Sequence, residues 1–304
     1  MKISLAGWSL HRRFRSQENP LLLLDFPRVA RQEFGLNAIE LNSPFFVSRD
    51  KRYLTELDDV AVGEGVDLLN IAVDGMGDLS DPDRAARQRA VENNAVWLAV
   101  AAHLGCAQVR INTGGKGREN DPDALLHCMD GYVELAQRGS KEGVMVLIEN
   151  HGGLSANPDN IVKIIETVDS PWIGTLPDFG NFPPEIDRYE ALEKLMPYAA
   201  AVHAKMGEFD EQGLETRFDI PRCYQIVKKG GYDGYLGIEF EGPGDEYEGV
   251  QQAKALLEKC ISEQIKYEGS GKSMAAVKTF GKKIPGLTKK LGISRGDGDR
   301  GSGS

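Results

Sequence analysis

The segment GVMVLIENHGG, residues 143–153, shows the pattern on which the fold prediction rests. Five apolar residues follow Gly143 and end at Glu149, and a stretch of helical periodicity, residues 123–141, precedes them. A short apolar run between glycines is typical of a strand buried on both faces, and glycine is common just after a helix. The segment therefore predicts a helix, a turn, a buried strand and a loop, in that order.

The same unit occurs eight times along the chain. The expected strands are residues 3–8, 38–41, 67–73, 107–112, 144–150, 172–178, 200–205 and 235–240. The expected helices are residues 21–34, 51–64, 83–104, 123–141, 158–168, 189–196, 219–229 and 247–264. Strands alternating with helices indicate parallel βαβ units, and eight such units predict a (β/α)8 TIM barrel. An open doubly wound sheet is the alternative, but GWSLHRR at residues 7–13 lacks its usual GxGxxG turn.

Local signals mark several helix ends. Asp81-Pro82 and Asn157-Pro158 each place a capping side chain before a proline at the first helical position. Gly65 and Gly143 follow helices, where a residue with positive φ is expected.

The length allows one large domain and a tail. The chain has 304 residues, a length that α/β barrels reach as a single domain, and we assign residues 1–268 to the barrel. Residues 269–304 are rich in Gly and Ser, and eight basic and two acidic residues follow Gly269. Their apolar residues are spaced by three and four, which gives a basic amphipathic stripe. We expect a flexible basic C-terminal tail, and the alternative is a peptide that docks to a partner, a shell or an anionic surface.

Charge, cysteine spacing and the lack of long apolar runs argue against a nucleic-acid-binding, a disulfide-rich or a membrane-spanning protein. The net charge of −10 argues against nucleic acid as a partner, because phosphate binding depends on clustered Lys and Arg. No apolar run approaches the roughly 18 residues of a transmembrane helix. The four cysteines are far apart, which favours free thiols in a reducing compartment. No signal peptide precedes the first expected strand, so we predict a cytoplasmic protein.

Polar residues end four consecutive expected strands. Glu149, Asp178, His203 and Glu239 occupy these positions. Taken alone, a buried carboxylate such as Glu149 is explained by an ion pair with Lys205 or Arg110. A lone His is explained as a core residue whose hydrogen bonds are satisfied. Together, three carboxylates converging on one mouth of a barrel repel one another unless a cation binds them. The set predicts one divalent metal ion, with Mn²⁺ or Mg²⁺ favoured by the oxygen ligands and Co²⁺ or Zn²⁺ as alternatives.

Several motifs resemble the xylose isomerase-like TIM-barrel superfamily, and within it the sugar phosphate isomerase/epimerase group. They are IENHGG (148–153), LPDFGN (176–181), VHAK (202–205) and FDIPRCYQIVKKGGYDGYLGIEFEG (218–242). The resemblance implies a sugar isomerase or epimerase that acts on a small carbohydrate through a metal-stabilised enediolate. It assigns Glu149 and Glu239 as catalytic bases on opposite faces of the substrate carbon. It also implies a homo-oligomer.

Six further residues are candidates for substrate binding. His151 and Lys205 each lie two positions after a predicted ligand and share its strand face. The other candidates are Arg110, Asn181, Trp8 and His11. Ketose epimerases usually have His where this chain has Asn181, and they have an Arg soon after the His ligand, whereas the next Arg here is Arg217. These differences argue against a simple free ketose as the substrate.

Two other functions remain open at this point. A lyase or dehydratase acting on a 3-oxo-glycoside or an inosose would use the same metal site and the same first proton abstraction, with His151 or Lys205 as the acid beside the leaving oxygen. A non-catalytic sugar-binding or scaffold barrel would instead act mainly through its basic tail.

Overall fold

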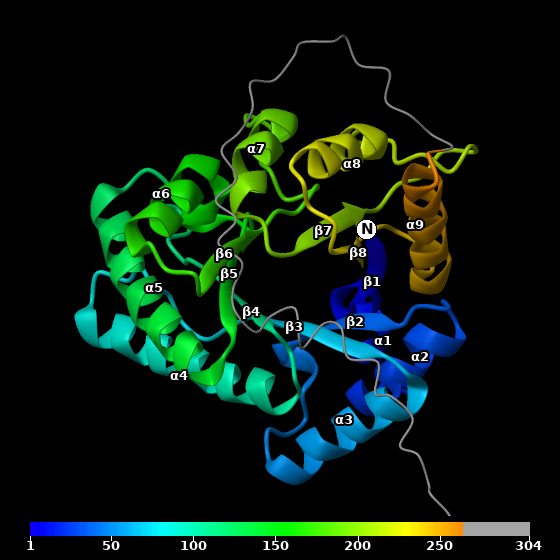
Figure 1. The fold of residues 1–304 in the computed structure, drawn as a ribbon, viewed down its shortest axis with the longest axis horizontal. Helices are drawn as coiled ribbons and strands as arrows, with labels where there is room; N and C mark the ends of the chain where they lie inside the picture. The colour runs from blue at the N-terminus through cyan, green and yellow to red at the C-terminus, as the bar shows by residue number, and fades with distance from the viewer. Residues whose placement is uncertain (264–304) are drawn as a thin grey trace, which may run out of the picture.

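In residues 1–263, which the computed structural model describes, eight parallel strands form a ring with helices around its outside (Figure 1). This arrangement confirms the predicted TIM barrel. The predicted domain boundary at residue 268 and the tail of residues 269–304 lie outside the described residues.

Each strand is followed by at least one helix. The strands are β1 (Lys2–Ala6), β2 (Ala38–Asn42), β3 (Asp67–Val73), β4 (Gln108–Ile111), β5 (Met145–Glu149), β6 (Ile173–Leu176), β7 (Val202–Met206) and β8 (Tyr235–Phe240). The helices are α1 (His11–Phe14), α2 (Phe26–Gln32), α3 (Lys51–Glu64), α4 (Arg84–His103), α5 (Pro122–Glu142), α6 (Pro158–Val168), α7 (Arg188–Leu195), α8 (Ile220–Lys229) and α9 (Glu246–Ile261).

The sheet runs in the order β6-β5-β4-β3-β2-β1-β8-β7, and the join between β6 and β7 closes it. There the backbone N–H of Ala200 donates to the carbonyl of Thr175 (2.9 Å), and that of His203 donates to Pro177 (3.0 Å). The N–H of Phe179 donates back to the carbonyl of His203 (3.1 Å). These bonds hold the loop that follows β6, and with it Asp178, against the strand that carries His203.

The expected helix ends are partly correct. Asn157 caps α6 by accepting a hydrogen bond from the N–H of Asp159, and Gly65 and Gly143 end α3 and α5 with φ of 67° and 69°. The expected cap at Asp81 was wrong, because Asp83 accepts the hydrogen bonds from the first turn of α4. The Asp81 carboxylate instead accepts from the N–H of Asp83, which forms a turn that delays the start of the helix.

Strands β1 and β6 each end two residues earlier than expected. β1 ends at Ala6, and Trp8 lies in the single 3-10 turn Gly7–Leu10 that follows it. β6 ends at Leu176, so Asp178 lies in the connecting loop and not at the end of the strand. Both residues nevertheless remain at the carboxyl ends of the strands, where a barrel gathers its functional side chains.

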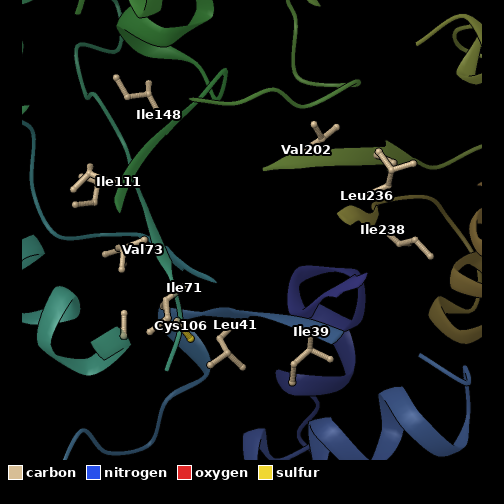
Figure 2. Packing of buried hydrophobic residues seen from close by; sticks show 14 of the residues in the cluster. Ile39, Leu41, Ile71, Val73, Cys106, Ile111, Ile148, Val202, Leu236 and Ile238 are labelled. Carbon is tan, nitrogen blue, oxygen red and sulfur yellow. The ribbon is translucent and has the colours of Figure 1, made fainter. Parts of the chain in front are cut away.

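Alternation along the strands separates two layers of buried side chains. Ile39, Leu41, Ile71, Ile148 and Ile238 belong to the large core that packs the sheet against the helices (Figure 2). Met145, Leu147, Leu176 and Ala201 form a smaller cluster, against which partly buried Ala200 packs. Since successive side chains of a strand point to opposite faces, Glu149, two residues beyond Leu147, points into the barrel.

Candidate metal centre

Glu149, Asp178, His203 and Glu239 lie together inside the mouth of the barrel. One ligand atom from each falls within 4.8 Å of the others, and all four residues are buried. The same alternation explains the direction of His203 and Glu239, because Val202 and Ala204 on either side of His203, and Ile238 and Phe240 on either side of Glu239, pack in the outer core. The structure thus brings the four predicted ligands to one point.

Asp178 carries the clearest sign that the cluster suits a cation. Its Oδ1 accepts hydrogen bonds from the N–H groups of Gly180 (2.7 Å) and Asn181 (2.8 Å). Its Oδ2 is buried and has no hydrogen-bond partner in residues 1–263. Burial raises the pKa of this carboxyl well above its ordinary value, and Glu239 and Glu149 raise it further, against the opposing effect of Lys205. A buried carboxylate oxygen without a donor, beside two other carboxylates, fits a divalent metal ion.

The two other carboxylates are held ionised. Burial alone would raise the pKa of Glu149, but Arg110 and His203 outweigh this effect and the pKa is lowered. The pKa of Glu239 is likewise lowered, because Lys205 and His203 outweigh its burial. Ionised carboxylates serve both as metal ligands and as bases.

His203 presents its Nδ1 to this cluster. Nδ1 lies 3.1 Å from Oε2 of Glu239 and 3.4 Å from Oε1 of Glu149. Its Nε2 points the opposite way, 2.9 Å from Oε2 of Glu40. Without a cation, these carboxylates raise the pKa of the imidazole well above its usual value even though burial acts to lower it.

A hydrogen-bonded arc extends from the cluster to the rim. Asn181 donates to Oε1 of Glu149 (3.2 Å), and Lys205 donates to Oδ1 of Asn181 (2.9 Å). Lys205 also donates to Oε2 of Glu241 (2.9 Å), whose other oxygen accepts from the indole N–H of Trp8. Three predicted substrate-binding residues, Trp8, Asn181 and Lys205, therefore lie along one side of the mouth.

The other three predicted substrate-binding residues lie at different depths in the mouth of the barrel. The His11 ring stacks on Trp8 at the rim, with the ring centroids 5.3 Å apart. His151 is exposed and lies close enough to lower the pKa of Asp74, after the larger effects of burial and Arg110. Arg110 is 3% exposed and is held between Asp74 (2.7 Å) and Glu149 (2.9 Å), so it contacts the predicted ligand Glu149 directly.

The sequence analysis missed two residues near the centre. Glu40 on β2 is 4% exposed and contacts His203, and Asp74, directly after β3, pairs with Arg110. Glu40 had the same signal as Glu149, because it is a carboxylate inside the apolar run AIELN of residues 38–42. Glu40 is the third of the five residues of β2, so a rule that considers only the last residues of each strand does not select it.

A family model described as the xylose isomerase-like TIM barrel matches residues 29–260. The chain belongs to this family. The resemblance inferred from the four motifs is thereby confirmed.

One curated relative has a local match. The alpha subunit of a C-glycoside deglycosidase from Arthrobacter globiformis is 38% identical over 93 residues. The match covers 28% of this chain and 25% of that protein, so only a quarter of the relative's length is spanned.

Solved structures of sugar epimerases share the fold. L-ribulose 3-epimerase superposes with a TM-score of 0.71 at 17% identity, covering 86% of this chain and 95% of its own. A D-tagatose 3-epimerase-like protein superposes with a TM-score of 0.70 at 16% identity, covering 86% of this chain and 98% of its own. The 3-keto-D-glucoside 4-epimerase from E. coli superposes with a TM-score of 0.68 at 15% identity, covering 86% of this chain and 100% of its own. At such low sequence identity, these superpositions show that the fold is shared and nothing further.

No helix within residues 1–263 is both long and apolar enough to cross a membrane.

Proposed function

We propose that this protein is a metal-dependent enzyme that removes a proton next to the carbonyl of a sugar or a sugar-like polyol. The observation that carries the proposal is the pair Glu149 and Glu239, two ionised carboxylates from β5 and β8 that approach the same nitrogen of His203. Two bases on different strands can act on different faces of one substrate carbon. This arrangement suits an isomerase or epimerase, in which one base removes a proton and the other returns one.

Glu149, Asp178, His203 and Glu239 would hold the cation. When bound, a divalent ion such as Mn²⁺ or Mg²⁺ supplies a Lewis acid that withdraws electron density from the substrate carbonyl. The need for it follows from the bases themselves. The lowered pKa of Glu149 and of Glu239 makes each a weak base, so the substrate C–H must be made more acidic.

The arc of residues at the rim would orient the substrate. Lys205 offers an ammonium group between Asn181 and Glu241, and substrate hydroxyls can replace these acceptors. Trp8 and His11 form a stacked pair of rings beside Glu241, and flat apolar ring faces suit the C–H faces of a sugar.

A lyase acting on a 3-oxo-glycoside is the second candidate, and the match to a C-glycoside deglycosidase subunit favours it. Both reactions share the first proton abstraction, after which a lyase needs a group that assists departure of the leaving group. Nearby carboxylates raise the pKa of Lys205 above its usual value despite its burial, so this ammonium holds its proton and acts as a hydrogen-bond donor. The exposed His151 is therefore the better candidate for the acid.

Incubation of the metal-loaded protein with ketoses and 3-oxo-glycosides in D₂O tests the proposal. Deuterium at a substrate carbon, detected by NMR without loss of a group, identifies an isomerase or epimerase. Release of an aglycone identifies a lyase. Glu149→Gln and Glu239→Gln should slow exchange by about 10²-fold to 10⁴-fold. Full exchange or turnover in both variants would contradict the roles given to Glu149 and Glu239, and no exchange or turnover by the wild-type protein would favour a binding or scaffold role.

A further inference from the structure

Glu40 lies directly behind the proposed metal centre, on the inner face of β2. Glu40 is neither one of the four predicted ligands nor a residue of the rim, and it is 4% exposed. Two contacts of its carboxylate come from the neighbouring strands. Ser4 of β1 donates to Oε1 (2.7 Å), and Asn70 of β3 donates to Oε2.

The third contact of Glu40 is with His203 of β7, across the barrel. Nε2 of His203 lies 2.9 Å from Oε2 of Glu40, while Nδ1 of the same ring faces Glu149 and Glu239. An imidazole that coordinates a metal through one nitrogen must carry its proton on the other. A carboxylate fixed beside Nε2 favours that tautomer and fixes the plane of the ring.

The backbone of β8 leaves room for this pair. A Cβ on Gly237 would lie 2.2 Å from Oε1 of Glu40 and 3.0 Å from Cδ2 of His203. Any side chain at this position would push the carboxylate and the imidazole apart. The glycine in YLGIEF, residues 235–240, thus provides the space in which Glu40 reaches His203.

We propose that Glu40 is a positioning residue for the metal centre. It accepts the Nε2–H of His203, which leaves the lone pair of Nδ1 directed at the cation. This proposal rests on the proposed metal site. Glu40 itself is not a fifth ligand, because Ser4, Asn70 and His203 already engage both of its oxygens.

Binding of Mn²⁺ to the full chain, followed by electron paramagnetic resonance of the free ion, provides the first test. Glu40→Ala should weaken binding by about 10-fold to 100-fold, the usual effect of removing a group that orients a metal ligand. Glu40→Gln keeps the acceptor but removes the charge, and it should weaken binding less than Glu40→Ala does. Gln108→Ala is the matched control, since Gln108 is another polar residue of the inner face and, among the described residues, its side chain bonds only to the carbonyl of Ala200.

The protonation state of the imidazole provides a readout that a merely structural role of Glu40 would not change. In wild-type protein loaded with Zn²⁺ and labelled with ¹⁵N-histidine, Nε2 of His203 should carry the proton and Nδ1 should show the shift of a coordinated nitrogen. Coordination through Nε2, or Mn²⁺ binding by folded Glu40→Ala and Glu40→Gln within about 2-fold of wild type, would overturn the proposal.

His203→Ala, which removes the ligand atom, separates this proposal from the metal site itself. If His203→Ala also binds Mn²⁺ like the wild type, the metal centre is wrongly assigned and the function proposed above fails with it. If His203→Ala loses Mn²⁺ while both Glu40 variants keep it, only the positioning role of Glu40 fails.

Discussion

Nε of Arg110 lies 2.9 Å from Oε2 of Glu149, and both side chains are almost completely buried. The same guanidinium contacts Asp74 at 2.7 Å. One buried cation therefore compensates two carboxylates, one of which is a proposed catalytic base. Because a buried charge without a partner is costly, Arg110 should contribute to stability as well as to the ionisation of Glu149.

Arg110→Met should destabilise the metal-free protein by about 3–5 kcal/mol, since it removes the buried cation that faces both the buried carboxylate of Glu149 and the half-buried one of Asp74. Urea unfolding with EDTA present measures this change. Arg138→Met is the control, because Arg138 also joins two carboxylates, Glu92 and Glu134, but at the surface. Its loss should cost about 1 kcal/mol or less. Equal effects of the two substitutions would contradict the role given to Arg110.

Affinity for the cation should rise with pH through the neutral range. In the metal-free site the pKa values of His203 and Asp178 are both raised, so these groups hold protons that the cation must displace. The logarithm of the association constant for Mn²⁺ should increase by about one to two per pH unit. Titrations of Mn²⁺ binding across the neutral range check this slope, and a flat profile would contradict the displacement of protons from these two groups.

Asp178→Asn should separate stability from metal binding. A carboxyl whose pKa is raised on folding favours the folded state at low pH, and this contribution is lost as pH rises through its folded pKa. At neutral pH the metal-free variant should therefore be more stable than the wild type, by about 1 kcal/mol or more. The amide oxygen can still accept from Gly180 and Asn181.

The same variant should bind Mn²⁺ more weakly, because it lacks one anionic ligand. Urea unfolding in EDTA and Mn²⁺ titration at the same pH give both quantities. A metal-free Asp178→Asn protein that is less stable than the wild type would indicate that the carboxylate is satisfied in some other way.

Lys205 variants test whether this ammonium is a donor or an acid. Lys205→Arg keeps the charge and the hydrogen-bond donors but cannot give up a proton at neutral pH. If Lys205 only donates hydrogen bonds, the variant should keep kcat within about 10-fold, whereas Lys205→Met should lose about 10²-fold. Equal losses in both variants, measured as deuterium exchange or aglycone release, would identify Lys205 as the acid.

Much of this site could be predicted from the sequence. Each strand pairs with its neighbours in parallel, so a polar residue near the carboxyl end of an apolar run must lie at one mouth of the barrel. That rule placed Glu149, His203 and Glu239 correctly on their strands. Asp178 lies just beyond β6, but the hydrogen bonds between Phe179 and His203 and between His203 and Pro177 keep it at the same level.

The rule did not identify the residues that contact the predicted ligands from behind. Glu40 and Asp74 are single acidic residues near the ends of β2 and β3, and the residues next to them in the sequence do not indicate their partners. Arg110 was expected to contact substrate, and its burial between Asp74 and Glu149 could not be read from a local pattern. Substrate contact by Arg110 stays a prediction.

The sequence by itself determined the order of strands and helices, because apolar runs and glycine positions act over a few residues. It also determined which strand residues share a face, because side chains alternate along a strand. Only the tertiary structure decided that Nε2 of His203 meets Glu40 while Nδ1 meets Glu149 and Glu239. That choice depends on closure of the barrel, which brings residues 163 positions apart within hydrogen-bonding distance.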